Sequence, residues 1–263
     1  MNSAEVVLSI EELAYAIGIL GDVEAASGFL LGTLGQRPRL EVEGRLLAAA
    51  HGLIARGYLE LDVVTNSSRL KDGLTRMVQP IVDGHYTLRL SRVKDGEEEV
   101  ATLYVSETGM VLHRLEHGVV SHLLSLADAA DVQAQCRSFF GLTEAPETAS
   151  ECLGKIPADT LDALRRNSQG RPVEELAAEI ASYGLGPLRA LDLAQALRRE
   201  TARGSIVRLE TKGDEIVSQR GLLLLEGQRS WWLFEISPTE TDVLSVYLGT
   251  PAVFDQLFMR LLS

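Results

Sequence analysis

Two segments of the chain show the same series of predicted elements, and this repetition constrains the fold more than any other feature. The segment 204–262 predicts four β-strands and a helix, because runs rich in branched and aromatic residues alternate with short polar breaks. The segment 85–142 shows the same pattern. The breaks are Lys94-Asp95-Gly96, Glu107-Thr108-Gly109, Lys212-Gly213-Asp214, Glu226-Gly227-Gln228 and Ser237-Pro238-Thr239. Such breaks predict hairpins and therefore antiparallel strands.

The two segments also keep their internal register. Leu88 corresponds to Val207 and Leu124 corresponds to Leu244, so two markers at opposite ends of the four-strand unit agree in spacing to within one residue. A predicted helix, 68–79 or 188–199, leads into each unit. We interpret the pattern as an internal duplication; the alternative is chance similarity between two amphipathic meanders.

The predicted fold class is therefore α+β, with two pseudo-symmetric halves. Each half consists of helices, an antiparallel four-strand meander and a closing helix. The N-terminal half spans 1–142, the aperiodic polar stretch 143–156 is the predicted linker, and the C-terminal half spans 157–263. The halves could also fuse into one domain with a single sheet.

The N-terminal part is predicted to be mainly helical. Ser9 followed by Glu12 is a capping-box pattern, so the first predicted element is a helix. A break is expected near Gly21, and a second helix is expected to end near Leu34. A third helix is followed by Gly57 and a strand over 58–64. Pro80 is expected to end the helix over 68–79.

Composition excludes several classes of protein. The chain of 263 residues has a formal net charge of −12, which opposes binding to phosphate backbones and favours basic or neutral partners. No apolar run approaches the roughly 20 residues that span a bilayer. Residues 1–5 lack the basic region of a secretory signal, so the expected location is the cytoplasm.

No pattern in the sequence predicts catalysis, a cofactor or a metal. The motifs GxGxxG, GxxxxGK[ST] and GxSxG are absent. Cys136 and Cys152 have no zinc-site spacing. His113 and His117 would lie roughly 13 Å apart on a strand, too far for one metal, and are expected to be outward polar positions. We therefore predict a protein that is not an enzyme.

One stretch offers an alternative function. Residues 49–59 resemble the end of a winged-helix module, in which a helix is followed by a glycine turn and a wing strand. The region 37–56, which overlaps this stretch, has few arginines, whereas DNA-binding helices usually place several basic residues against phosphates. They are Arg37, Arg39, Arg45 and Arg56. A winged-helix-derived transcriptional regulator is the alternative, with nucleic-acid binding the less favoured prediction.

Both tryptophans of the chain are adjacent on a predicted strand. Trp231 and Trp232 must point to opposite faces of the sheet, so at least one needs either a covering helix or a partner. The second half also has more apolar residues than one buried face requires, including the run 222–225. We predict that Trp231, Trp232 and Tyr247 border a groove or interface that binds a partner.

The order of predicted elements resembles the EspG-like family of ESX secretion-associated proteins. The resemblance lies in the N-terminal helices with 46–61, the meander from His85, the second half, and the ending Trp231 to Thr239 followed by 243–262. Members are cytoplasmic chaperones of type VII secretion. The resemblance implies a non-enzymatic chaperone or adaptor for a helical protein partner.

Overall fold

The computed structural model describes residues 5–21, 23–62, 64–65, 67–142, 151–212, 215–228, 231–236 and 242–262. The chain forms two compact units. The first comprises residues 1–87 and 101–129, and the second comprises 88–100 and 130–263. No helix in the described ranges has the length and apolar character that a membrane-spanning helix requires.

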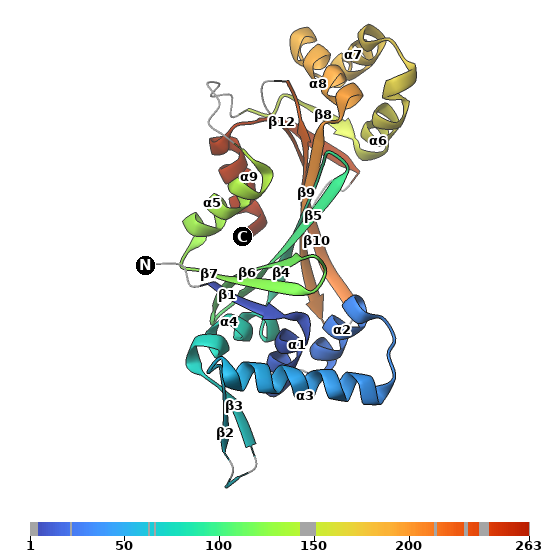
Figure 1. Cartoon of the computed structure of the whole chain (residues 1–263). Helices are drawn as coiled ribbons and strands as arrows, with labels where there is room; N and C mark the ends of the chain where they lie inside the picture. Colours follow the sequence, from blue (N-terminus) through green and yellow to red (C-terminus); the bar gives the residue numbers. More distant parts are fainter. Residues whose placement is uncertain are drawn as a thin grey trace. The chain divides into compact units, whose positions relative to one another are not determined.

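The first unit combines a helical layer with antiparallel strands (Figure 1). Its hydrogen-bonded strand order is β1-β7-β6-β5, and each of these neighbouring pairs is antiparallel. The helices are α1 (Ile10–Ile19), α2 (Val23–Leu34), α3 (Arg39–Ala55) and α4 (Asp72–Val82). The strands are β1 (Glu5–Ser9), β6 (Gly109–Glu116), β7 (Val120–Leu126), the part of β5 (Glu97–Ser106) from residue 101, and the hairpin β2 (Leu59–Asp62) and β3 (Ser67–Leu70).

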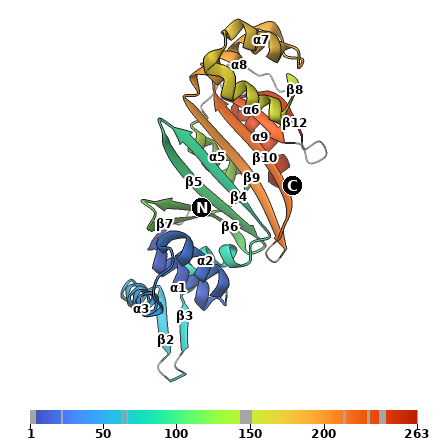
Figure 2. The ribbon, with the colours of Figure 1, turned by 90° about the vertical axis from the view of Figure 1, so that its right-hand side faces the viewer.

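The second unit contains the strand order β4-β9-β10-β11-β12-β8. The strands lie side by side in Figure 2 and have helices on both faces in Figure 1. The strands are β4 (Tyr86–Lys94), β8 (Gly154–Pro157), β9 (Ala202–Lys212), β10 (Glu215–Glu226), β11 (Trp231–Ile236) and β12 (Val243–Gly249). The helices are α5 (Ala129–Phe140), α6 (Ala158–Asn167), the short η1 (Ser168–Gly170), α7 (Val173–Ala181), α8 (Pro187–Arg199) and α9 (Pro251–Leu262).

The predicted fold class is confirmed. Both predicted meanders are present as four consecutive strands, β4 to β7 and β9 to β12, and the helices α5 and α9 follow them. The duplication itself stays a prediction. The capping box is also confirmed, since the Ser9 hydroxyl accepts from the Glu12 amide at 3.1 Å and the Glu12 carboxylate accepts from the Ser9 amide at 2.9 Å.

Three local predictions are wrong. The first described element is the strand β1, which pairs with β7, and the helix follows it. Residues 67–70 form β3 instead of the start of a helix, and the helix α4 continues past Pro80 to Val82. Pro80 lies in the last turn of α4, and Arg76, whose carbonyl it leaves without an amide, is exposed to solvent.

The compact units divide the chain differently from the predicted halves. The strand β4 and helix α5 belong to the second unit, although both precede the predicted linker. The ring of Phe140 packs beside that of Phe254 at 6.4 Å, and Arg137 pairs with Asp255. Of the predicted linker, residues 143–150 lie outside the described residues, and Gly154 to Ile156 belong to β8. The division into two halves stays a prediction.

Candidate binding site

The second unit contains an apolar pocket of about 330 Å³ between the sheet and the helices α6 and α8. This volume is at the lower end of the range for ligand pockets, roughly 300–1,000 Å³. Its floor consists of aliphatic and aromatic side chains from three strands. They are Leu223, Leu225, Phe234, Ile236 and Leu244.

Strand alternation places the floor residues on one face. Leu223 is opposite Phe234 in the β10–β11 pairing, and Ile236 is opposite Leu244 in the β11–β12 pairing. Side chains two residues apart on a strand share a face, so Leu225 joins them. Leu223 and Ile236 are only half-buried, whereas Phe234 and Leu244 are buried. The pocket is therefore a place where this hydrophobic core is open to solvent.

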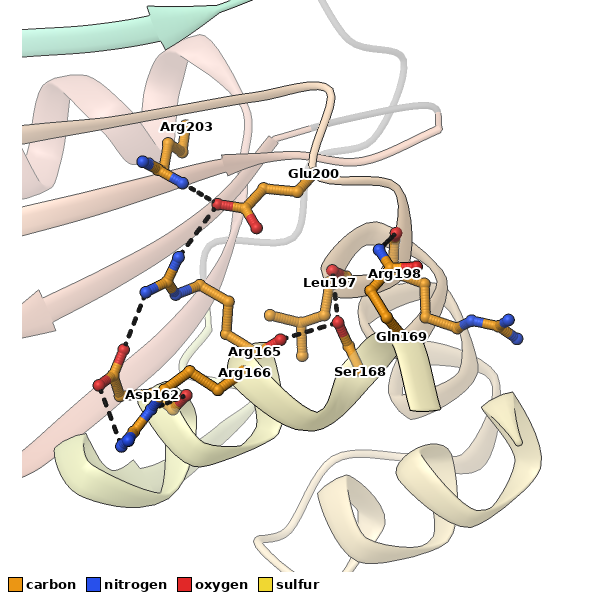
Figure 3. Close-up of polar contacts among 9 residues, drawn as sticks. All are labelled: Asp162, Arg165, Arg166, Ser168, Gln169, Leu197, Arg198, Glu200 and Arg203. Carbon is orange, nitrogen blue, oxygen red and sulfur yellow. Dashed lines mark hydrogen bonds and ion pairs between the residues drawn. The ribbon is translucent and has the colours of Figure 1, made fainter. Parts of the chain in front are cut away.

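A network of arginines and carboxylates borders the pocket, and all of its members except Arg166 line it (Figure 3). We call Asp162, Arg165, Arg166, Glu200 and Arg203 the rim network. Arg165 on α6 donates to Asp162 at 3.2 Å and to Glu200 at 3.3 Å, while Arg203 on β9 donates to the same Glu200 oxygen. Arg166 pairs with Asp162 at 3.3 Å. Hydrogen bonding to Asp162 is the main cause that raises the pKa of Arg165.

Two further hydrogen bonds connect η1 to α8 beside the rim (Figure 3). The buried Ser168 hydroxyl lies 3.2 Å from the Leu197 carbonyl, and the Gln169 side chain donates to the Arg198 carbonyl at 2.6 Å. Both acceptors lie in the last turn of α8, where carbonyls have no partner within the helix. These contacts hold the ends of α6 and α8 together.

Glu200 has an unusual backbone. It follows α8 with φ 40° and ψ 50°, the left-handed conformation that glycine normally supplies after a helix. A side chain in this region costs roughly 1 kcal/mol relative to glycine. Strain of this kind at a cavity rim is a reason to ask what the side chain does there.

The three sequence-predicted partner-binding residues are all buried. Trp232 faces the core formed with α6 and α8, together with Phe234, while Trp231 alternates to the opposite face. Tyr247 is also buried; its hydroxyl lies 3.0 Å from the Glu235 carboxylate, and burial is the main cause that raises its pKa. Trp232 neighbours the floor within one core, but none of the three residues lines the pocket. Their role in partner binding stays a prediction.

The pocket was not predicted from the sequence, although two features of the sequence belong to it. The apolar surplus over 222–225 supplies Leu223 and Leu225 to the floor. The paired arginines that end α6 also point to the site, although nothing local reveals that Arg203 meets Glu200 and Arg165 there. These contacts depend on the packing of α6 against the sheet.

The arginines of the winged-helix alternative are engaged within the chain. Arg39 pairs with Glu43 at 2.6 Å, Arg45 with Glu11 at 3.0 Å, and Arg56 with Glu12 at 2.8 Å. Arg37 donates to the Leu34 carbonyl at 2.9 Å. Carboxylates neutralise three of these four cations, which disfavours a phosphate-binding surface on α3.

The histidines do not form a metal site within the described residues, where no suitable group of three ligands occurs. His113 was expected to face solvent, but it is buried, lies 3.2 Å from the Ser121 hydroxyl, and burial lowers its pKa to about 4. The His113 side chain is on the face of β6 that the helices cover, where its ring lies 5.8 Å from that of Phe29 on α2. His117 is in the turn that follows β6, with φ 50°.

The chain is thus an α+β protein with an open apolar pocket, and comparisons with known proteins show what it is similar to. Residues 5–177 match the family described as uncharacterised protein YfjC, so the chain belongs to the YfjC family. The comparison with curated proteins finds no match. Among solved structures, the chain is similar to the Mycobacterium tuberculosis type VII secretion system chaperone EspG5, solved in complex with a PE25-PPE41 dimer.

The structural similarity extends over nearly both chains. The TM-score is 0.66 and the sequence identity is 11%, with 98% of this chain and 96% of the EspG5 chain covered. At this identity the similarity establishes a shared fold. The resemblance to EspG-like proteins is thus confirmed for the architecture, and the family that the sequence match establishes is YfjC.

Proposed function

We propose that this protein is a non-enzymatic cytoplasmic chaperone or adaptor for a helical protein partner, and that the pocket receives an apolar segment of that partner. The observation that carries the proposal is the open apolar floor, where Leu223 and Ile236 remain half-exposed between two helices and a sheet. Grooves of this kind accept the apolar face of an amphipathic helix. The fold shared with a chaperone that binds a protein dimer supports the proposal.

In this role the pocket binds a partner and does not catalyse a reaction. Its rim consists of arginines and carboxylates that pair with one another, and its floor is apolar. Such an arrangement gives shape and charge recognition, the two properties that a chaperone or adaptor site needs.

The test is to fill the pocket. Ala158, the half-buried first residue of α6, lines the pocket, so Ala158→Phe should occupy it while leaving the deeper core intact. Ala48→Phe on the exposed face of α3 is the matched control. Proteins encoded beside this one would be co-expressed and co-purified with each variant, and thermal melts would confirm folding.

We expect a helical protein to be retained by the parent protein and by Ala48→Phe, and to be lost with Ala158→Phe. Equal retention by Ala158→Phe would remove the pocket as the binding site. Salt-sensitive retention of the parent on heparin, without a helical partner, would instead favour the transcriptional regulator.

A further inference from the structure

The rim network carries a local surplus of positive charge. Three guanidinium groups face two carboxylates, in a chain with a formal net charge of −12. Helix C-termini favour basic residues, which accounts for Arg165 and Arg166 in the last turn of α6. Arg203 lies on β9, so the helix dipole does not account for it.

The surplus lies at the edge of the pocket: Asp162, Arg165, Glu200 and Arg203 line it, and the third arginine, Arg166, is outside the lining and pairs with Asp162. Both Arg165 and Arg203 line the pocket, and their side chains are 38% and 48% exposed, respectively. An occupant of the floor would therefore lie within reach of guanidinium groups that still contact water. Guanidinium groups bind carboxylates through several donors in a fixed geometry.

Glu200 is the group with which such an occupant would compete. A single Glu200 oxygen accepts from both Arg165 and Arg203, and the backbone of Glu200 is held in the left-handed conformation. Ion pairs between partly exposed groups contribute little to stability, so an external carboxylate could exchange for Glu200 at low cost.

We propose that the partner segment is acidic: an amphipathic helix whose apolar side chains occupy the floor and whose flanking Asp or Glu side chains pair with Arg165, Arg166 and Arg203. This inference rests on the proposed function and adds the chemistry of the partner. The bulk negative charge of the protein favours a basic partner, whereas the charge at the pocket favours an acidic one. At contact distance the local charges determine which partner is favoured, since charges further than roughly 8 Å away are screened at physiological salt.

The probe is a displayed library of helical peptides. Apolar residues would be fixed at i, i+4 and i+7, and the flanking positions would be randomised among Glu, Gln and Lys. The library would be selected on the intact protein and counter-selected on Ala158→Phe. Peptides that bind the parent and not Ala158→Phe depend on the pocket, and their charge is the readout.

Enrichment of Glu among pocket-dependent peptides is the expected result. Enrichment of Gln or Lys would overturn the acidic partner and leave the proposed function in place. Failure to recover any pocket-dependent peptide would overturn both the acidic partner and the assignment of the pocket. Displacement of the acidic peptides by inorganic phosphate at equal concentration would show a general anion site and would overturn the proposal.

Variants of the rim give a second, independent readout with one selected acidic peptide. Arg165→Glu and Arg203→Glu should each weaken its binding about two- to fivefold, the range for single exposed ion pairs. Glu200→Gly should strengthen binding by a similar factor, because glycine fits the left-handed backbone and no longer competes for the arginines. Arg69→Glu, on an exposed arginine of the first unit, is the charge-matched control and should leave affinity unchanged.

Unchanged affinity in the rim variants would contradict the proposal, as would an equal loss with Arg69→Glu. Thermal melts would check folding, and Arg165→Gln and Arg203→Gln would replace any reversal variant that fails to fold. The neutral variants should show a smaller loss in the same direction.

Discussion

Glu12 in the first unit and Glu200 in the second both bind arginine, yet their surroundings differ. Glu12 is buried, accepts from the Ser9 amide at 2.9 Å and pairs with Arg56 at 2.8 Å, which also donates to the Val7 carbonyl at 2.5 Å. Glu200 lies at the rim of a pocket and shares one oxygen between two arginines. An arginine–glutamate ion pair thus joins β1, α1 and α3 in the first unit, whereas a pair of the same type borders an open pocket in the second.

The difference shows that an arginine–glutamate contact has no fixed role. At Glu12 the pairing satisfies a buried carboxylate and the partly buried Ser9 amide, so removing one partner leaves others unsatisfied. At Glu200 water can replace each partner, so the pairing contributes little to stability and is available for exchange. Substitutions at the two sites should therefore give different results.

The largest expected effect is at Glu12. Glu12→Ala removes the acceptor of the Ser9 amide and the partner of Arg56, and should lower the free energy of unfolding by about 2–4 kcal/mol. Glu200→Ala is the comparison and should lower it by less than about 1 kcal/mol. Urea unfolding followed by circular dichroism would measure both. Equal losses would show that the two networks do not differ in this way.

A second contrast concerns His113 and His122 on the neighbouring strands β6 and β7. Burial, and secondarily the charge of His122, lowers the pKa of His113 to about 4. The His122 ring lies between Glu116 at 2.9 Å and Glu5 at 3.2 Å, and hydrogen bonding to Glu116 is the main cause that raises its pKa. Their contributions to stability should therefore change with pH in opposite directions.

For His113 the unfolded state binds the proton first, so stability falls as pH falls from about 6.5 towards 4, by about 2 kcal/mol at pH 5. For His122 the stabilisation is fully present below pH 6.5 and is lost as pH rises through its raised pKa. NMR titration of both imidazole rings in the intact protein would measure the two values. Titration of both near pH 6.5 would contradict the assigned environments.

The smallest expected effects on stability are at two glycines of α3, Gly52 and Gly44. A Cβ at Gly52 would lie 2.7 Å from a Glu12 carboxylate oxygen, so Gly52→Ala should displace Glu12 and lower the free energy of unfolding by about 1 kcal/mol. Gly44 has nothing within 4 Å of that position, so Gly44→Ala should raise stability by about 0.5–1 kcal/mol through helix propensity. Thermal melts of both variants would reveal the opposite signs. A gain at Gly52 would show that Glu12 is free to move.

Local signals in the sequence predicted the elements that local physics determines. The hairpin breaks and strand alternation predicted β4 to β7 and β9 to β12, and the Ser9–Glu12 capping box predicted the start of α1. The strand β1 was missed because it is five residues long and its pairing partner, β7, is more than a hundred residues away. The strand β3 was read as helix because Leu70, Leu74 and Met77 have helical spacing.

The candidate site was less predictable. Trp231 and Trp232, which were predicted from the sequence to border a partner-binding groove, are both buried. The pocket exists because the packing of α6 and α8 leaves Leu223 and Ile236 half-exposed. This exposure depends on tertiary structure, so the periodicity of the sequence cannot predict it. His113 was likewise expected to face solvent but is buried.

The interleaved composition of the two units has a consequence for folding kinetics. The chain passes from the first unit into the second at residue 88, returns at 101 and leaves again at 130, so neither unit is one continuous stretch. In the second unit β4 must find β9, more than a hundred residues later in the chain. Contacts this distant in sequence slow folding, because loop closure is costly before the contacts repay it. A fragment that ends at residue 142 would contain β4 and α5 without the strands and helix on which they pack, and should therefore expose apolar surface and aggregate.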